Sequence, residues 1–155
     1  MYDKRLSEFN YKLLNNILCC NLFLEKCKIR LNAKCDRCDE GSEDIMHLID
    51  GCHNVNRVWK SLGKILNFSV LWKHIVIGFY EESNSKTIFL NTIITYIAYK
   101  IYKFKMSCRI QNLEQSRLKL EESIKNSLNR DIDLLVSFSK IRISKETVLC
   151  IRNIL

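Results

Sequence analysis

The chain has 155 residues, 47% of them hydrophobic, and its 25 lysines and arginines outnumber its 17 acidic residues to give a formal net charge of +8. A chain of this length and composition can bury one ordinary core, which argues against an intrinsically disordered protein. Proline is absent and there are only four glycines, so few positions have to interrupt a helix. The composition therefore predicts a mainly α fold.

The segment before residue 35 predicts two short helical pieces. Residues 7–18 place apolar side chains on one helical stripe, with Ser7 as a candidate N-cap, and residues 22–29 form a second apolar segment. The N-terminal residues MYDKRLSEFNYK lack the apolar stretch of a secretory signal. We therefore expect an intracellular, reducing location, cytoplasm or nucleus, and free thiols rather than a disulfide scaffold among the eight cysteines.

Residues 35–52, which read CDRCDEGSEDIMHLIDGC, contain the strongest motif in the chain. Cys35 and Cys38 form a C-x2-C pair, His47 follows after eight residues, and Cys52 follows after four more. These ligand types at this spacing predict one tetrahedral zinc ion held by three thiolates and one imidazole. Because such a shell leaves no open coordination position, the metal would be structural rather than catalytic.

The residues between the ligands suit this role. Residues 39–42 contain turn formers, and Asp44 or Ser42 is a candidate cap for a short helix that points His47 toward the metal. Two alternatives remain open from the residues alone. The spacing can arise without a metal, or His53 can replace the last cysteine as the fourth ligand, since imidazole and thiolate both bind zinc.

The residues that follow the motif predict a helix over 54–66. Val55, Val58, Trp59 and Leu62 recur in it at helical spacing. We expect Trp59 to anchor this helix against the metal-organised turn, because a tryptophan on an apolar stripe is more often a core residue than a base-stacking one.

The ordered pattern over residues 9–59 resembles the zinc-binding domain that follows the polymerase in non-LTR retrotransposon (LINE-type) reverse transcriptases. Its parts are FNYKLLNNIL, FLEKCKI, the C-x2-C pair, EDIMHL, the GC dipeptide and VNRVW, and the later WKHIVIGF extends the likeness loosely. The resemblance implies the same four zinc ligands, a role in assisting nucleic-acid binding, and an absent polymerase domain as a partner. One departure is His53, which stands where the family often has a proline.

The segment from Lys86 to Cys108 is apolar in its first half and basic in its second. Residues 88–102 carry a single charge, but these fifteen residues fall short of the roughly 20 that a membrane span needs. We therefore predict a buried central helix and no membrane partner. Its predicted inner stripe consists of Ile93, Ile94, Ile97 and Ile101.

The far end of this segment combines aromatic and basic side chains, namely Tyr99, Lys100, Lys103, Lys105 and Arg109. Aromatic rings stack on bases and cations neutralise phosphates, so these residues are the candidate contacts for RNA or single-stranded DNA. The alternative is a half-buried helix whose lysines are simply solvated. The family resemblance favours the binding interpretation.

The remaining chain predicts a helical extension. Residues 111–136 form a polar pattern that indicates a helix facing solvent or a partner, and residues 140–155 begin with alternation and then become helical. We divide the chain into a zinc-binding domain at 1–80, with its knuckle at 35–52, and an extension at 81–155. The predicted fold is a small helical domain built around a CCHC zinc knuckle.

Charge and missing motifs restrict the function. The knuckle holds six acidic residues against one basic residue, whereas residues 1–34 and 53–155 are both basic, so phosphate contacts are expected from its flanks. The chain lacks the Asp-Asp pair of a polymerase and any Gly-rich phosphate loop. We therefore expect a non-catalytic, nucleic-acid-binding zinc module. The alternative is a zinc-stabilised module that binds another protein.

Overall fold

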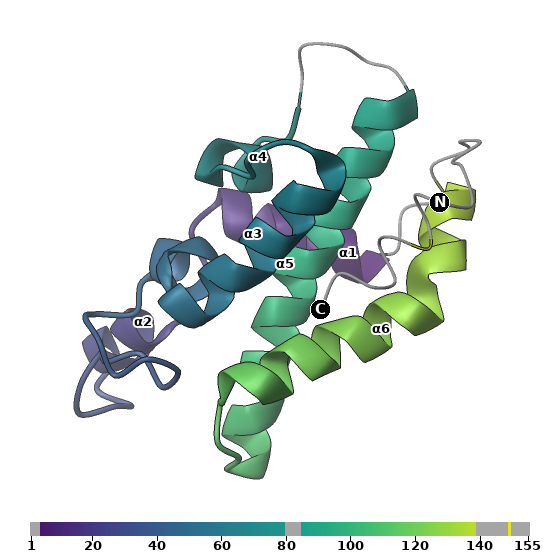
Figure 1. Cartoon of the computed structure of the whole chain (residues 1–155). Coiled ribbons are helices and arrows are strands. Elements are labelled where there is room, and N and C mark those ends of the chain that lie inside the picture. The colour runs from purple at the N-terminus through teal and green to yellow at the C-terminus, as the bar shows by residue number, and fades with distance from the viewer. Residues whose placement is uncertain (1–3, 80–84, 139–148, 150–155) are drawn as a thin grey trace.

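A computed structural model of the chain describes residues 4–79, 85–138 and 149 (Figure 1). It is mainly helical, with 71% helix and no strand assigned in the described residues, which confirms the predicted α class. The elements are α1 (Lys4–Leu14), α2 (Asn21–Lys26), the π-helical turn η1 (His47–Gly51), α3 (His53–Leu66), α4 (Trp72–Val76), α5 (Ser85–Gln111) and α6 (Arg117–Phe138).

The long helix α5 is the centre of the fold. It contacts α1, α4, α6 and η1, and Figure 1 shows it running through the molecule with the other helices around it. The predicted inner stripe is confirmed, because its four isoleucines are completely buried. None of the helices in the described residues is long and apolar enough to cross a membrane.

Helix α6 lies against α5 rather than standing apart in solvent. Five side chains on one face of it are buried, namely Leu120, Ile124, Leu128, Ile132 and Leu135. The hydroxyl of Tyr96 on α5 donates a hydrogen bond to the backbone oxygen of Ser127 at 3.0 Å, and Lys100 pairs with Asp131 at 3.4 Å. The prediction of a single solvent-facing or partner-facing helix over 111–136 is therefore wrong in two respects, because α6 starts only at Arg117 and its apolar face is part of the core.

The N-terminal helices differ from the predicted bounds. Helix α1 begins at Lys4, so Ser7 lies inside it and is not its cap, and it ends at Leu14, shortly before Asn16 takes a positive φ of 57°. Its buried face still includes Phe9, whose ring packs edge-on against Tyr99 of α5 with centroids 5.6 Å apart. The predicted segment 140–155 lies outside the described residues, apart from the isolated position 149.

Helix α3 packs against η1, as the sequence predicted. The apolar residues that recur at helical spacing are all buried: Val55, Val58, Trp59 and Leu62. The indole nitrogen of Trp59 donates a hydrogen bond to the backbone oxygen of Ile49 at 2.8 Å. Trp59 therefore joins α3 to the turn that begins with the candidate ligand His47.

The connection from α3 to α4 depends on a close backbone approach at Gly63. A Cβ atom at this position would lie 2.6 Å from the backbone oxygen of Phe68. The chain folds back there because Asn67 adopts a left-handed conformation and the amide of Phe68 donates to the oxygen of Gly63 at 3.0 Å.

We predict that Gly63→Ala lowers the free energy of unfolding by about 1–3 kcal/mol, because overpacking outweighs the roughly 1 kcal/mol by which alanine is the better helix former. Urea unfolding followed by circular dichroism measures the change. Ser61→Ala is the matched control in the same helix and should be close to neutral. A Gly63→Ala variant more stable than the wild type would contradict the role given to this contact.

Candidate metal centre

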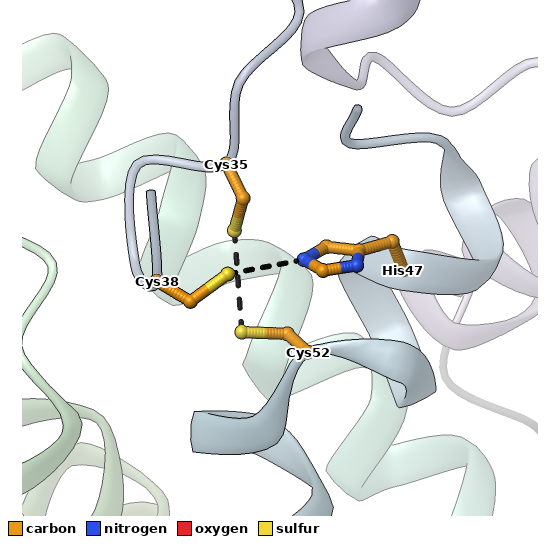
Figure 2. Close-up of side chains that lie close together, drawn as sticks. All are labelled: Cys35, Cys38, His47 and Cys52. Carbon is orange, nitrogen blue, oxygen red and sulfur yellow. Dashed lines mark hydrogen bonds between the residues drawn. The ribbon is translucent and has the colours of Figure 1, made fainter. Parts of the chain in front are cut away.

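The four predicted ligands come together from three adjacent pieces of chain (Figure 2). Cys35 and Cys38 flank a tight turn in which the amide of Asp39 donates to the oxygen of Cys35 at 2.9 Å. His47 is the first residue of η1, and Cys52 lies between η1 and α3. Figure 2 shows all four side chains pointing into one space.

The turn η1 has the spacing that brings His47 and Cys52 together. Its π-helical hydrogen bond runs from the amide of Cys52 to the oxygen of His47 at 3.0 Å, five residues back. At the other end, the carboxylate of Asp44 accepts a hydrogen bond from the amide of His47 at 2.7 Å. Of the two predicted capping residues, Asp44 is thus the one that holds the start of this turn.

The distances between ligand atoms fit a tetrahedral zinc ion. The Sγ atoms of Cys35 and Cys52 are 4.0 Å apart, Cys38 Sγ is 3.4 Å from His47 Nε2, and the four ligand atoms all lie within 4.8 Å of one another. Ordinary Zn–S and Zn–N bond lengths in a tetrahedron place two sulfurs about 3.8 Å apart and a sulfur and a nitrogen about 3.6 Å apart. A disulfide needs sulfurs only about 2 Å apart, and these cysteines are free.

The two innermost thiols are linked by a hydrogen bond. Cys35 and Cys52 are both completely buried, and the thiol of Cys35 donates to the sulfur of Cys52. This hydrogen bond lowers the pKa of Cys52 below its usual range and, together with burial, raises the pKa of Cys35. Metal binding requires both residues as thiolates, so an ion at this centre would displace their thiol protons.

A buried guanidinium lies beside the cysteines. Arg37, between Cys35 and Cys38 in the sequence, is only 7% exposed and donates one hydrogen bond from Nη2 to the backbone oxygen of Leu48 at 3.1 Å. Its charge helps to lower the pKa of Cys52. Zn²⁺ with three thiolates and a neutral imidazole carries a net charge of about −1, and Arg37 is placed to offset it.

His53, the alternative fourth ligand, points elsewhere. Its Nδ1 lies 3.6 Å from the carboxylate of Glu40, and both side chains are exposed. His53, Glu40 and Cys38 form a second group of potential ligands. Glu40 and His53 of this group are exposed, whereas Cys35 and Cys52 of the first group are buried, and the two groups share Cys38. Cys52 therefore fits the inner cluster better than His53 does.

Lys105 does not lie on the surface, so its predicted place in a nucleic-acid platform is wrong. Its side chain is completely buried and forms an ion pair with the equally buried carboxylate of Glu43 in the knuckle. Its Nζ also donates to Asn21 Oδ1 at 3.0 Å and lies 3.5 Å from Asp36. A buried ammonium needs such partners because its desolvation is costly.

Further cations reach the same polar cluster. Arg30 contacts both oxygens of Asp36, at 2.7 and 3.0 Å, and Arg109 donates to Asn21 Oδ1 at 2.6 Å. Asn21 is completely buried at the start of α2 and also donates to the backbone oxygen of Lys34 at 2.6 Å. Two of the acidic residues of the knuckle are therefore neutralised from within the protein.

The other predicted platform residues are only partly accessible. Tyr99 is half-buried against Phe9. Lys100 is held by Asp131 and lies over the ring of Tyr96, with 4.8 Å between its Nζ and the ring centroid. Of the five predicted residues, Lys103 alone is fully exposed.

A sequence signal for the burial of Lys105 does exist. Ile93, Ile97, Ile101 and Lys105 are each four residues apart, so they share one helical face. The buried stripe of α5 therefore continues into Lys105. Charge alone suggested an exposed residue, and the periodicity was the better indicator.

Comparisons of the chain with profiles of protein families, with curated proteins and with solved structures find no match. The likeness to reverse transcriptase zinc-binding domains therefore rests on the sequence pattern. The described structure adds the cluster of Cys35, Cys38, His47 and Cys52, a group that could hold a metal ion.

We predict that the purified chain holds one zinc ion, and that the Cys38→Ser, Cys52→Ser double variant loses it. Metal analysis by mass spectrometry measures the content per chain. Cys27→Ser, which changes an exposed cysteine outside the cluster, is the control and should retain the metal. Stoichiometric zinc in the double variant would disprove the ligand assignment.

We predict that Lys105→Met lowers the free energy of unfolding by about 3–5 kcal/mol, because it leaves the buried charge of Glu43 without its partner. Chemical denaturation measures the loss. Adding Glu43→Gln to this variant removes the unpaired charge and should restore part of the stability. If the Lys105→Met variant unfolds at the same midpoint denaturant concentration as the wild type, the ion pair does not contribute this stability.

Proposed function

We propose that the chain is a non-catalytic zinc-binding module, in which one structural zinc ion fixes the knuckle to a helical core whose exposed basic helices contact nucleic acid. The observation that carries the metal part is the convergence of Cys35, Cys38, His47 and Cys52 within 4.8 Å. Three sulfurs and one imidazole nitrogen form a ligand set typical of structural zinc.

The ligand set favours a structural role over chemistry. A catalytic zinc keeps one position for water or substrate, whereas here protein side chains supply all four positions. Cys35 and Cys52 are completely buried and Cys38 and His47 are half-buried, which also favours a structural role. The hydrogen bond from Trp59 to the backbone oxygen of Ile49 would then hold α3 in a fixed position relative to the metal.

The nucleic-acid part is supported by charge. The chain carries a net charge of +8, and two knuckle carboxylates, Asp36 and Glu43, are neutralised by Arg30 and Lys105. The acidic knuckle therefore repels phosphates less than its composition suggests. The resemblance of residues 9–59 to reverse transcriptase zinc-binding domains supports the same partner class.

Exposed apolar side chains favour a second candidate, a protein-binding module. Phe23, Ile29 and Leu31 lie within nine residues of one another and are 52%, 70% and 101% exposed. Such a group can meet another protein, for example a polymerase domain of the same polypeptide. Salt distinguishes the two candidates, since phosphate contacts weaken steeply with salt concentration and apolar contacts do not.

We predict that removing zinc with a chelator unfolds the knuckle and loosens α3 while most helical signal remains. Structural zinc contributes about 10 kcal/mol or more in small zinc domains, but the α5–α6 interface is built from buried apolar residues, none of which is a metal ligand. Hydrogen exchange should show lost protection at residues 35–66 and retained protection at 93–101. Complete loss of the helical circular dichroism signal would contradict the prediction that only the knuckle and α3 depend on zinc. Added zinc should restore the hydrogen-exchange protection of residues 35–66.

A further inference from the structure

The exposed face of α3 carries three cations in one row. Arg57, Lys60 and Lys64 are all exposed, and their spacing of three and four residues places them on one side of the helix. At 100° per residue this side lies opposite the buried face formed by Val55, Val58, Trp59 and Leu62. We refer to Arg57, Lys60 and Lys64 as the α3 stripe.

Within the described part of the chain, no acidic side chain neutralises the α3 stripe. Helix α3 contains no aspartate or glutamate, and none of the salt bridges among the described residues involves the stripe. By contrast, Lys100, Lys105 and Arg30 are each paired with a carboxylate. The stripe thus places three adjacent positive charges on one rigid element.

We infer that the α3 stripe binds the phosphate backbone of a double-stranded nucleic acid. The three side chains extend over about 10 Å of helix axis, at 1.5 Å per residue, which matches a contact with several successive phosphates. This inference rests on the proposed function, which it deepens by naming the surface and the form of the ligand.

The exposed face of α3 carries no phenylalanine, tyrosine or tryptophan ring, which favours a duplex. Binding of single strands combines cations with aromatic rings that stack on unpaired bases. Trp59 is 3% exposed and its indole nitrogen is bonded to Ile49, and the exposed ring of His53, at the start of α3, lies 3.6 Å from the carboxylate of Glu40. A duplex presents its phosphates outward and keeps its bases stacked inside, so cations alone are sufficient to hold it.

The metal centre fixes the orientation of the stripe. Cys52 directly precedes α3 and its backbone oxygen accepts hydrogen bonds from Val55 and Asn56, at 2.9 and 2.8 Å. Cys52, one of the four candidate metal ligands, therefore also takes part in the first turn of α3. Binding of zinc should therefore increase the affinity for a duplex, although the metal itself makes no contact with the phosphates.

The test uses the zinc-loaded full chain and three probes of one 20-nucleotide sequence: duplex DNA, duplex RNA and the single strand. The variant Arg57→Gln, Lys60→Gln, Lys64→Gln removes the stripe. The control Lys26→Gln, Lys73→Gln, Lys86→Gln removes the same number of exposed positive charges from α2, α4 and α5. Zinc content and circular dichroism establish that both variants fold.

The inference predicts tighter binding of a duplex than of the single strand, and a decrease of more than about tenfold in duplex affinity for the stripe variant. For the stripe variant, the slope of log affinity against log salt concentration should become less steep by about 0.9 for each phosphate that the variant no longer neutralises. Equal weakening by the control would overturn the inference, since net charge would then explain it, and so would preference for the single strand. A wild-type chain that binds none of the probes would overturn the proposed nucleic-acid function as well.

Discussion

The ion pair between Lys105 and Glu43 is the contact on which the arrangement of the molecule depends. Neither charge can remain in the interior without the other, and the two residues belong to α5 and to the knuckle, 62 positions apart in the chain. Asn21 adds the start of α2 to the same point, through its backbone amide to the carboxylate of Glu43 at 3.1 Å. The loop that carries the first cysteines is thus held against the central helix by polar bonds that only the complete fold can satisfy.

The metal cluster and this polar cluster act on opposite sides of the same loop. Cys35 faces the other ligands, whereas Asp36, the next residue, faces Arg30 and Lys105. The buried side chain of Arg37 then faces the side of the candidate ligands, where its charge would offset that of an anionic metal–thiolate centre. Consecutive residues of this loop therefore face two different environments, and two of the acidic residues of the knuckle, Asp36 and Glu43, serve its own packing.

The sequence predicted the features that depend on local spacing. Four ligands, the inner stripe of α5 and the anchoring role of Trp59 all follow from periodicity or motif spacing, and the structure brings them together as expected. The features it did not predict depend on distant partners. Lys105 looked like a surface lysine because Glu43 is remote in sequence, and α6 looked solvent-facing because its polar positions outnumber the apolar stripe that α5 covers.

The π-helical turn between His47 and Cys52 limits how the chain can change in length. His47 begins this five-residue turn and Cys52 directly follows it, so one inserted or deleted residue would turn Cys52 around the helix axis and away from the other three. The loop from Asp39 to Ser42 has no such constraint, since its residues are exposed and none of them is in the inner cluster. Over evolutionary time, length variation should therefore accumulate before the histidine, while the interval after it stays fixed.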